Sequence, residues 1–375
     1  MLLNTSLLTL LLLAITTASP IAKRSPKHLS FSIEKEEKND NSNVKGKRTS
    51  SETLPLENTS NYAYYIHFGL GSNKTPIRAQ IDSGSYSFWV PESTTGDSLN
   101  KFDAFKSTTF KNESKSYAYY YNGGDSIQGY WGNDDLWLSD TNKLPKYEFG
   151  TVYKYTRSTP LIGISQLSSE NYNYSIANSM KNAGLIDHSA ISIDLSTSSN
   201  KNGNLLFGAI DKAKYEGKMG ILNTTDGSKA VINSISFENG KNFNTKTKVL
   251  LDTGSSASYF KKDALDPILN EISGGNLNSN YDFDCSLINQ NKNLTFNFDG
   301  ISINVPYSDL FYPYGSVCKS YLVVGSSSIL WSDWAVLGDH FLRHAYTAFN
   351  FDTEKVGIAQ AVHNNDETDL IDFYF

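Results

Sequence analysis

The chain has 375 residues, of which 39% are hydrophobic and 13% aromatic, and its formal net charge is −6 at pH 7. This composition excludes a fibrous or wholly disordered protein, and the length allows one large core or two medium ones. The excess of acidic side chains argues against nucleic acid as a partner.

The N-terminus has the pattern of a secretory signal peptide. Residues 2–15 are predominantly apolar, are too few to cross a bilayer, and are followed by the small residues Ala18 and Ser19. No Lys or Arg precedes the apolar run, and a buried helix is the alternative interpretation. We expect a signal peptide over residues 1–19 and therefore a secreted, extracellular protein.

The next segment, residues 23–51, consists mainly of Lys, Glu, Asn and Ser, so it cannot bury enough surface to fold by itself. It contains two dibasic pairs, Lys23-Arg24 and Lys47-Arg48, which a kexin-like processing protease could reach. We expect a propeptide over residues 20–48 with cleavage after Arg48. This segment is basic and would meet acidic groups of the remaining chain, which has 25 positive and 35 negative side chains.

Beyond residue 49 the pattern is predominantly that of β-strands. Turns rich in Gly, Asn and Ser separate short runs rich in aromatic and β-branched residues, such as Tyr64 to Phe68, Tyr117 to Tyr121 and Leu294 to Phe298. Helical periodicity is confined to short stretches such as 176–184 and 262–272. We expect an all-β fold with few helices.

An internal repeat divides this part of the chain. Ile81-Asp82-Ser83-Gly84-Ser85 recurs 170 residues later as Leu251-Asp252-Thr253-Gly254-Ser255. Leu161-Ile162-Gly163-Ile164 is likewise echoed by Val336-Leu337-Gly338-Asp339. We therefore expect two lobes of like design, over residues 49–215 and 216–375.

The repeated motif suits a pair of carboxylates. The apolar run places a strand in the core, the glycine lets the backbone approach its neighbour, and the hydroxyls can hydrogen-bond the aspartate. If the lobes face each other, Asp82 and Asp252 meet, and two charges about 3 Å apart repel by roughly 5 kcal/mol at an effective dielectric near 20. One carboxyl group then keeps a proton. Such a pair can activate water and protonate a substrate carbonyl with no cofactor or metal.

The remaining motifs concern export and stability. The two cysteines, Cys285 and Cys318, are expected to form a disulfide in an oxidising compartment, with two free buried thiols as the alternative. The C-terminus has neither a long apolar tail nor an anchor signal, so we expect a protein that is not held on a membrane. We also expect a monomer. Glycosylation is expected at the sequons Asn58, Asn73, Asn112, Asn173, Asn223 and Asn293.

Two other kinds of catalytic site compete with the carboxylate pair as interpretations of the sequence. His340 and His344 stand four residues apart in a predicted helix, a spacing that can bind zinc, but no Glu follows the first His and no third ligand is indicated. We expect a structural role for both. Glycosidases also use two acids, but not as a repeated Asp-Thr-Gly turn.

The sequence resembles the pepsin-type aspartic proteases, and most of all the secreted candidapepsins of yeasts, from about Tyr62 to Ala361. The resemblance implies a bilobal all-β fold whose cleft binds an extended peptide and is closed by a β-hairpin flap. It also implies an aspartic-type endopeptidase that acts on peptide or protein substrates at acidic pH. The matching segments are 69–71, 81–91, 206–215, 250–256 and 337–350.

The resemblance further implies roles for single residues. Asp82 and Asp252 would be catalytic. Tyr121 would be the tyrosine of the flap and Trp89 its hydrogen-bonding partner, although Tyr121 could also be one more strand aromatic. The residues that would support the aspartates are Ser83, Gly84, Ser85, Thr253, Gly254 and Ser255, and Gly124 would belong to the flap.

The sequence departs from the family pattern at several positions. Ser83 stands where Thr is usual, Asn122 and Gly123 replace the usual flap residues, Pro160 replaces a Gly, and the disulfide common in the first lobe is missing. These departures leave open a second function, that of a catalytically weak or inactive homologue that binds peptides.

Overall fold

A computed structural model describes residues 26–38, 61–93, 100–121, 124–166, 174–195, 203–224, 227–326, 334–362 and 365–375. The predicted signal peptide, both dibasic pairs, the sequons at Asn58 and Asn173, and the two altered flap residues lie outside this part of the chain.

The described residues are predominantly β, as the sequence predicts, and the two stretches predicted to be helical are confirmed as α1 and α2. None of the helices described is long and apolar enough to span a membrane. The helices are α1 (Ile176–Asn182), α2 (Lys262–Ile272), α3 (Tyr307–Leu310) and α4 (Asp339–Leu342). The strands are β1 (Leu29–Lys38), β2 (Asn61–Leu70), β3 (Thr75–Asp82), β4 (Phe88–Pro91), β5 (Lys111–Tyr120), β6 (Ser126–Trp137), β7 (Lys143–Tyr155), β8 (Leu161–Gly163), β9 (Ala190–Asp194), β10 (Gly203–Phe207), β11 (Ile210–Asp211), β12 (Gly220–Asn223), β13 (Lys229–Phe237), β14 (Asn242–Leu251), β15 (Ser258–Phe260), β16 (Asn293–Asn297), β17 (Ser302–Pro306), β18 (Phe311–Tyr314), β19 (Val317–Ser320), β20 (Leu322–Val324), β21 (Trp334–Leu337), β22 (Ala345–Asn350), β23 (Lys355–Gln360) and β24 (Leu370–Ile371).

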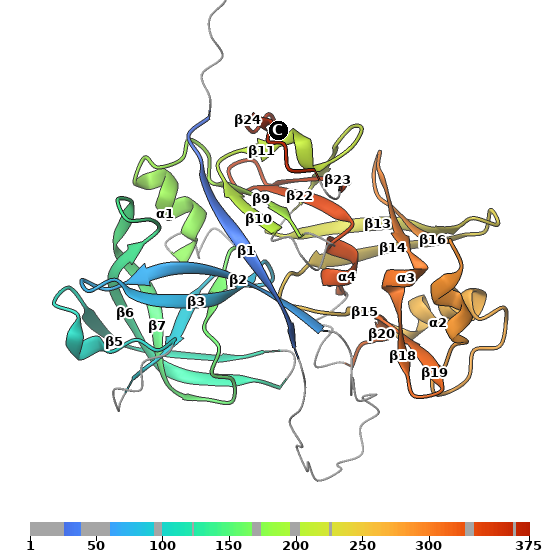
Figure 1. The fold of residues 1–375 in the computed structure, drawn as a ribbon, viewed down its shortest axis with the longest axis horizontal. Helices are drawn as coiled ribbons and strands as arrows, with labels where there is room; N and C mark the ends of the chain where they lie inside the picture. Colours follow the sequence, from blue (N-terminus) through green and yellow to red (C-terminus); the bar gives the residue numbers. More distant parts are fainter. Residues whose placement is uncertain are drawn as a thin grey trace, which may run out of the picture.

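Two large sheets carry the fold, with β2 to β8 on one side of the molecule and β13 to β20 on the other (Figure 1). Within the described residues the larger sheet has thirteen strands, in the order β12-β23-β22-β9-β10-β1-β2-β3-β8-β4-β7-β6-β5. The smaller sheet has seven, in the order β17-β16-β13-β14-β21-β15-β20. Because β22 and β23 come from the end of the chain, the larger sheet joins the two lobes.

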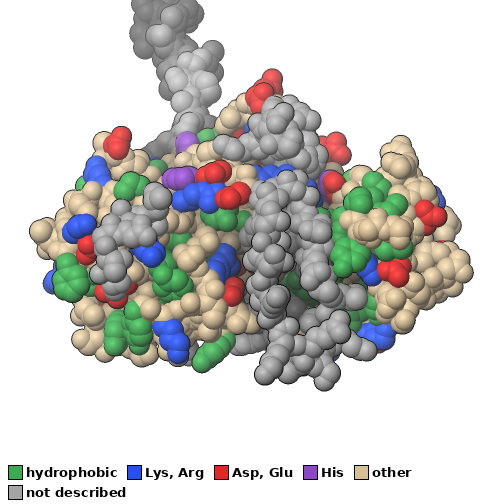
Figure 2. Space-filling model, turned by 60° about the horizontal axis from the view of Figure 1, so that its bottom comes forward, with side chains coloured by type: hydrophobic (Ala, Val, Ile, Leu, Met, Phe, Trp, Pro, Cys, Tyr) green, Lys and Arg blue, Asp and Glu red, His purple; other side chains and the backbone are tan. Residues whose placement is uncertain are grey.

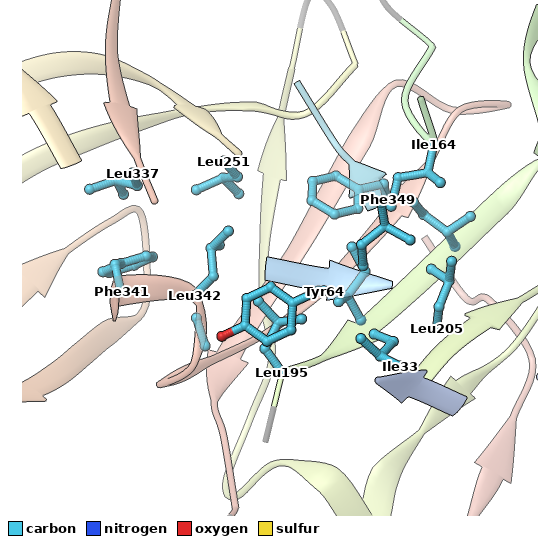
Figure 3. Close-up of a cluster of buried hydrophobic side chains, with 14 of the residues drawn as sticks. Ile33, Tyr64, Ile164, Leu195, Leu205, Leu251, Leu337, Phe341, Leu342 and Phe349 are labelled. Atoms are coloured by element: carbon cyan, nitrogen blue, oxygen red, sulfur yellow. The ribbon is translucent and has the colours of Figure 1, made fainter. Parts of the chain in front are cut away.

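Strand β1 lies inside the predicted propeptide. Its first half pairs antiparallel with β10 and its second half with β2, and it runs between the two lobes (Figure 1). Phe31 and Ile33 are buried, and Ile33 joins a cluster that includes Leu205 and Phe349 (Figure 3). The polar composition predicts no structure for this segment on its own. It becomes a strand here because β10 and β2 supply backbone partners and its alternate apolar side chains face the core.

Ion pairs fix the second half of β1 to the neighbouring strands. The carboxylate of Glu34 accepts hydrogen bonds of 2.9 Å from Nε and Nη2 of Arg78 and lies 2.7 Å from Nε2 of His67. Hydrogen bonding to Arg78, and then to His67, lowers the pKa of Glu34 to about 2. In these pairs β1 contributes the acidic side chain, and the neighbouring strands contribute the basic ones. This is the reverse of what we expect from the sequence, in which a basic propeptide meets acidic groups of the remaining chain. Acidic and basic side chains are also mixed on the face shown in Figure 2.

The predicted disulfide is confirmed. Cys285 and Cys318 are bonded, with their Cα atoms 5.0 Å apart and a separation of 33 positions in sequence. The bond ties the short 3-10 helix Cys285–Asn289 to β19. A disulfide that closes a loop of this length stabilises the folded state by about 3–4 kcal/mol, because it lowers the conformational entropy of the unfolded chain.

Candidate active site

Two equivalent turns form the candidate site. Strand β3 ends at Asp82, and β14 ends at Leu251, directly before Asp252. Strand β8 pairs in parallel with β3 and antiparallel with β4, while β21 pairs in parallel with β14 and antiparallel with β15. The sequence repeat is therefore a repeat of structure, in which the echoed segments supply β8 and β21.

The two turns are hydrogen-bonded to each other. The backbone N–H of Thr253 donates to Oγ of Ser83 at 2.9 Å, and the N–H of Ser83 donates to Oγ1 of Thr253 at 3.0 Å. The Ser83 hydroxyl donates to the carbonyl of Leu251 at 2.7 Å, and the Thr253 hydroxyl to that of Ile81 at 3.2 Å. Both hydroxyl-bearing residues are buried. Ser83 thus makes the bond between the lobes without the methyl group of the usual threonine.

Each aspartate is held by a matching pair of donors. Oδ1 of Asp82 accepts from the Gly84 N–H at 2.9 Å and Oδ2 from the Ser85 hydroxyl at 2.6 Å. Asp252 repeats this arrangement with the Gly254 N–H at 2.8 Å and the Ser255 hydroxyl at 2.7 Å. Both oxygens of each carboxylate are engaged, so neither side chain is free to rotate.

The two glycines let the aspartates meet. A Cβ atom on Gly84 would lie 2.8 Å from Oδ1 of Asp252, and one on Gly254 would lie 2.7 Å from Oδ1 of Asp82. Any larger residue would push the opposite carboxylate away. With glycine at both positions, the carboxyl groups of Asp82 and Asp252 come within hydrogen-bonding reach.

The surroundings favour a proton shared by the pair. Burial, and then the charge on Asp82, raise the pKa of Asp252 well above its usual range, while the Ser255 hydroxyl and the Gly254 N–H oppose this rise. Asp82 is only 6% exposed, so little water screens the two groups from each other. One protonated and one ionised carboxyl group is therefore the favoured state on the acid side of neutrality.

A hairpin made by β5 and β6 reaches toward this pair. Its turn is closed by hydrogen bonds from the Tyr121 N–H to the Asp125 carbonyl at 2.7 Å and from the Gly124 N–H to the Tyr121 carbonyl at 3.0 Å. Nε1 of Trp89 donates to the Tyr121 hydroxyl at 2.7 Å. Burial, and then the charge on Asp82, raise the pKa of Tyr121, so its phenol stays protonated.

The two histidines do not form one site. Helix α4 contains His340 but ends at Leu342, so the expectation that His344 shares this helix is wrong. The ring of His340 stacks on Tyr321, and burial lowers its pKa to about 3. Nε2 of His344 lies 2.6 Å from a carboxylate oxygen of Asp309. These separate partners fit the structural roles that we expect.

Sequence reasoning missed two further contacts beside the aspartates. The hydroxyls of Tyr86 and Tyr119 are 2.9 Å apart, and those of Ser87 and Tyr117 are 3.0 Å apart. A signal was available, because Tyr117 and Tyr119 alternate along β5, with Tyr121 in the same alternation directly after it, and so share a face. Their partners, however, come from the loop after Asp82, which local sequence does not connect to β5.

Comparisons with known proteins agree with this geometry. The family model of eukaryotic aspartyl proteases matches residues 63–361. An acid protease of Saccharomycopsis fibuligera is 29% identical over 341 residues, which is 85% of this chain and 86% of the relative. Candidapepsin-1 of Candida albicans is 28% identical over 378 residues, covering 93% and 94% of the two chains. Secreted aspartic protease 10 of the same species is 28% identical over 358 residues, covering 86% and 77%. The chain therefore belongs to the eukaryotic aspartyl protease family, and it is an aspartic-type endopeptidase with a bilobal, all-β, pepsin-like fold.

Proposed function

We propose that this protein is a secreted endopeptidase that hydrolyses peptide bonds at acidic pH with a water molecule activated between Asp82 and Asp252. The observation that carries the proposal is the matched hydrogen bonding of the two carboxylates, each held by a glycine N–H and a serine hydroxyl. Two fixed carboxyl groups that share one proton supply a general base and a general acid in one place.

In this mechanism the ionised carboxylate takes a proton from the water as its oxygen attacks the substrate carbonyl carbon. The protonated carboxyl group donates its proton to the carbonyl oxygen, and the raised pKa of Asp252 favours that residue as the donor in the free protein. The tetrahedral intermediate then breaks its C–N bond as the nitrogen receives a proton from the carboxyl group that took it from water. One of the two hydroxyls of the intermediate returns its proton to the other carboxylate, which restores the carbonyl and the singly protonated pair. The substrate would lie between the aspartates and the hairpin that carries Tyr121.

The proposal predicts hydrolysis of a denatured protein at acidic pH by the purified chain that begins after Arg48. Pepstatin, whose hydroxyl mimics the tetrahedral intermediate, should inhibit, and metal chelators should leave the activity unchanged. Oligosaccharides should not be cleaved. If the protein binds pepstatin but hydrolyses no protein substrate, the alternative of a peptide-binding homologue is correct instead.

The proposal includes a maturation route. Secretion through residues 1–19 and cleavage by a kexin-like protease after Lys47-Arg48 would precede activity. The relatives named secreted aspartic proteases support the secretion step. The structure adds a distinction among the described sequons. Asn73, Asn112 and Asn223 are exposed, whereas Asn293 is half-buried in β16 with Nδ2 3.4 Å from Oε1 of Glu238.

Mass spectrometry of the secreted protein checks this route in one experiment. The N-terminal peptide should begin at Thr49, and a start far downstream of it would refute cleavage after Arg48. Enzymatic deglycosylation in heavy-oxygen water should mark Asn73, Asn112 and Asn223 more fully than Asn293, because an acceptor asparagine must be reachable on the surface. Equal or higher occupancy at Asn293 would contradict the distinction.

A further inference from the structure

The inner face of β5 is connected to the loop after Asp82 by side chains. Tyr117, Tyr119 and Tyr121 alternate along the chain, so their side chains lie on the same face. Two phenols meet residues of that loop, at 3.0 Å for Tyr117 to Ser87 and 2.9 Å for Tyr119 to Tyr86. The third, that of Tyr121, accepts a hydrogen bond of 2.7 Å from Trp89 in β4, the strand that follows the loop.

Strand β5 needs such contacts because it is an edge strand. Among the described strands it pairs only with β6, at the end of the larger sheet, and the register between the two shifts between Asn112 and Ser116. Its outer edge therefore has no strand to hold it. The position of β5 relative to Asp82 therefore depends on β6, which is itself paired with β7, and on what the inner face of β5 touches.

The contact of Tyr86 with Tyr119 is placed to control this position. Tyr86 directly follows Ser85, whose hydroxyl donates to Asp82, and Tyr119 stands two residues before Tyr121. The two rings meet edge to face, with centroids 6.4 Å apart. Burial, and then the hydrogen bond to Tyr86, raise the pKa of Tyr119, so its phenol keeps its proton at acidic and neutral pH.

The contacts of Tyr117 with Ser87 and of Tyr121 with Trp89 lie at opposite ends of the hairpin. Ser87 and Tyr117 are almost completely buried, so their bond belongs to the core at the base of the hairpin. Trp89 and Tyr121 meet near the turn. Tyr86 and Tyr119 lie between the base and the turn of the hairpin and are half-buried, so the bond between their hydroxyls can break without opening the core.

We propose that Tyr86 and Tyr119 form a latch that holds the flap hairpin in position over Asp82 and Asp252. Both are positioning residues, since they act through the flap rather than on the substrate. The kinetic part of this inference rests on the proposed function. When the latch is lost, a smaller fraction of molecules holds the flap in the position that binds substrate, and the apparent affinity falls by that fraction.

The first test measures kinetics in Tyr86→Phe, Tyr119→Phe and the double variant, each of which keeps the ring and removes only hydroxyls. Each single variant should raise KM and the inhibition constant of pepstatin about three- to tenfold, the range of one ordinary hydrogen bond. kcat should change by less than about twofold, because the aspartates are untouched. The double variant should be no worse than either single variant, since all three lack the same bond.

Tyr130→Phe is the matched control. Tyr130 on β6 and Tyr153 on β7 form a comparable pair with ring centroids 5.4 Å apart, but both rings are exposed. This control should leave KM unchanged. Additive effects of Tyr86→Phe and Tyr119→Phe, or a lower kcat with an unchanged KM, would overturn the latch.

The second test needs no activity. Hydrogen exchange at the backbone amides of residues 117–121 in the free protein should be faster in Tyr86→Phe than in the wild type, and unchanged in Tyr130→Phe. Unchanged exchange in Tyr86→Phe would overturn the latch even if the enzyme is active. A wild-type protein that hydrolyses nothing would instead refute the proposed function, and hydrogen exchange would still decide whether the latch exists.

Discussion

Asp252→Asn is expected to remove peptide-bond hydrolysis, lowering kcat by at least about 10²–10⁴-fold, and Asp82→Asn should do the same. The amide has the size and shape of the carboxyl group, so the turns of Gly84 and Gly254 can keep their geometry. It cannot, however, take a proton from water or share one with the remaining aspartate. Hydrolysis of a denatured protein at acidic pH measures the loss, and near-ultraviolet circular dichroism checks the fold.

Asp211→Asn is a suitable control for the replacement of a buried aspartate elsewhere. Asp211 is 2% exposed and accepts hydrogen bonds from the backbone N–H groups of Ala213 and Asp369. The variant should lose some stability but keep its kcat. Folded Asp82→Asn or Asp252→Asn protein with substantial activity would show that these residues are not the catalytic pair.

The second large effect is on pH dependence. We expect a bell-shaped profile of kcat/KM with its optimum on the acid side of neutrality, because the working species is the singly protonated pair. The Ser255 hydroxyl lowers the pKa of Asp252, so Ser255→Ala should raise that pKa. The proton donor then persists to higher pH, and the alkaline limb should move upward by about one pH unit, as expected for one hydrogen bond to a charged group.

Ser85→Ala changes the corresponding donor to Asp82 and should also shift or narrow the limbs of the profile. Ser192→Ala provides the control, since this buried hydroxyl donates to the carbonyl of Ala209 at 2.9 Å and touches neither aspartate. Its profile should match the wild type. Full activity at pH 8 with none at pH 4 would exclude the shared-proton mechanism for this protein.

The aspartate turns could be predicted from sequence because each is a short contiguous motif, repeated with its glycine and its hydroxyls. Helices α1 and α2 follow from local periodicity in the same way. The position of β1 could not be predicted, because the composition of residues 23–51 is polar and the partner of Phe31 in β10 is far along the chain. The contact of Tyr86 with Tyr119 depends likewise on a loop and a strand that come together only in the folded lobe.

The pairing of β1 also bears on how the chain folds as it is synthesised. Leu29 pairs with Phe207, and the sheet that contains both is completed by β22 and β23, which end at Gln360. Such distant pairings are formed slowly, since a long loop must close before any contact compensates for its entropy. The first lobe cannot be finished while the ribosome is still making the second, although domains usually fold in order of synthesis. Strand β1 therefore cannot be fixed between its partners until residue 207 has been made, and until then its apolar face needs protection from other chains.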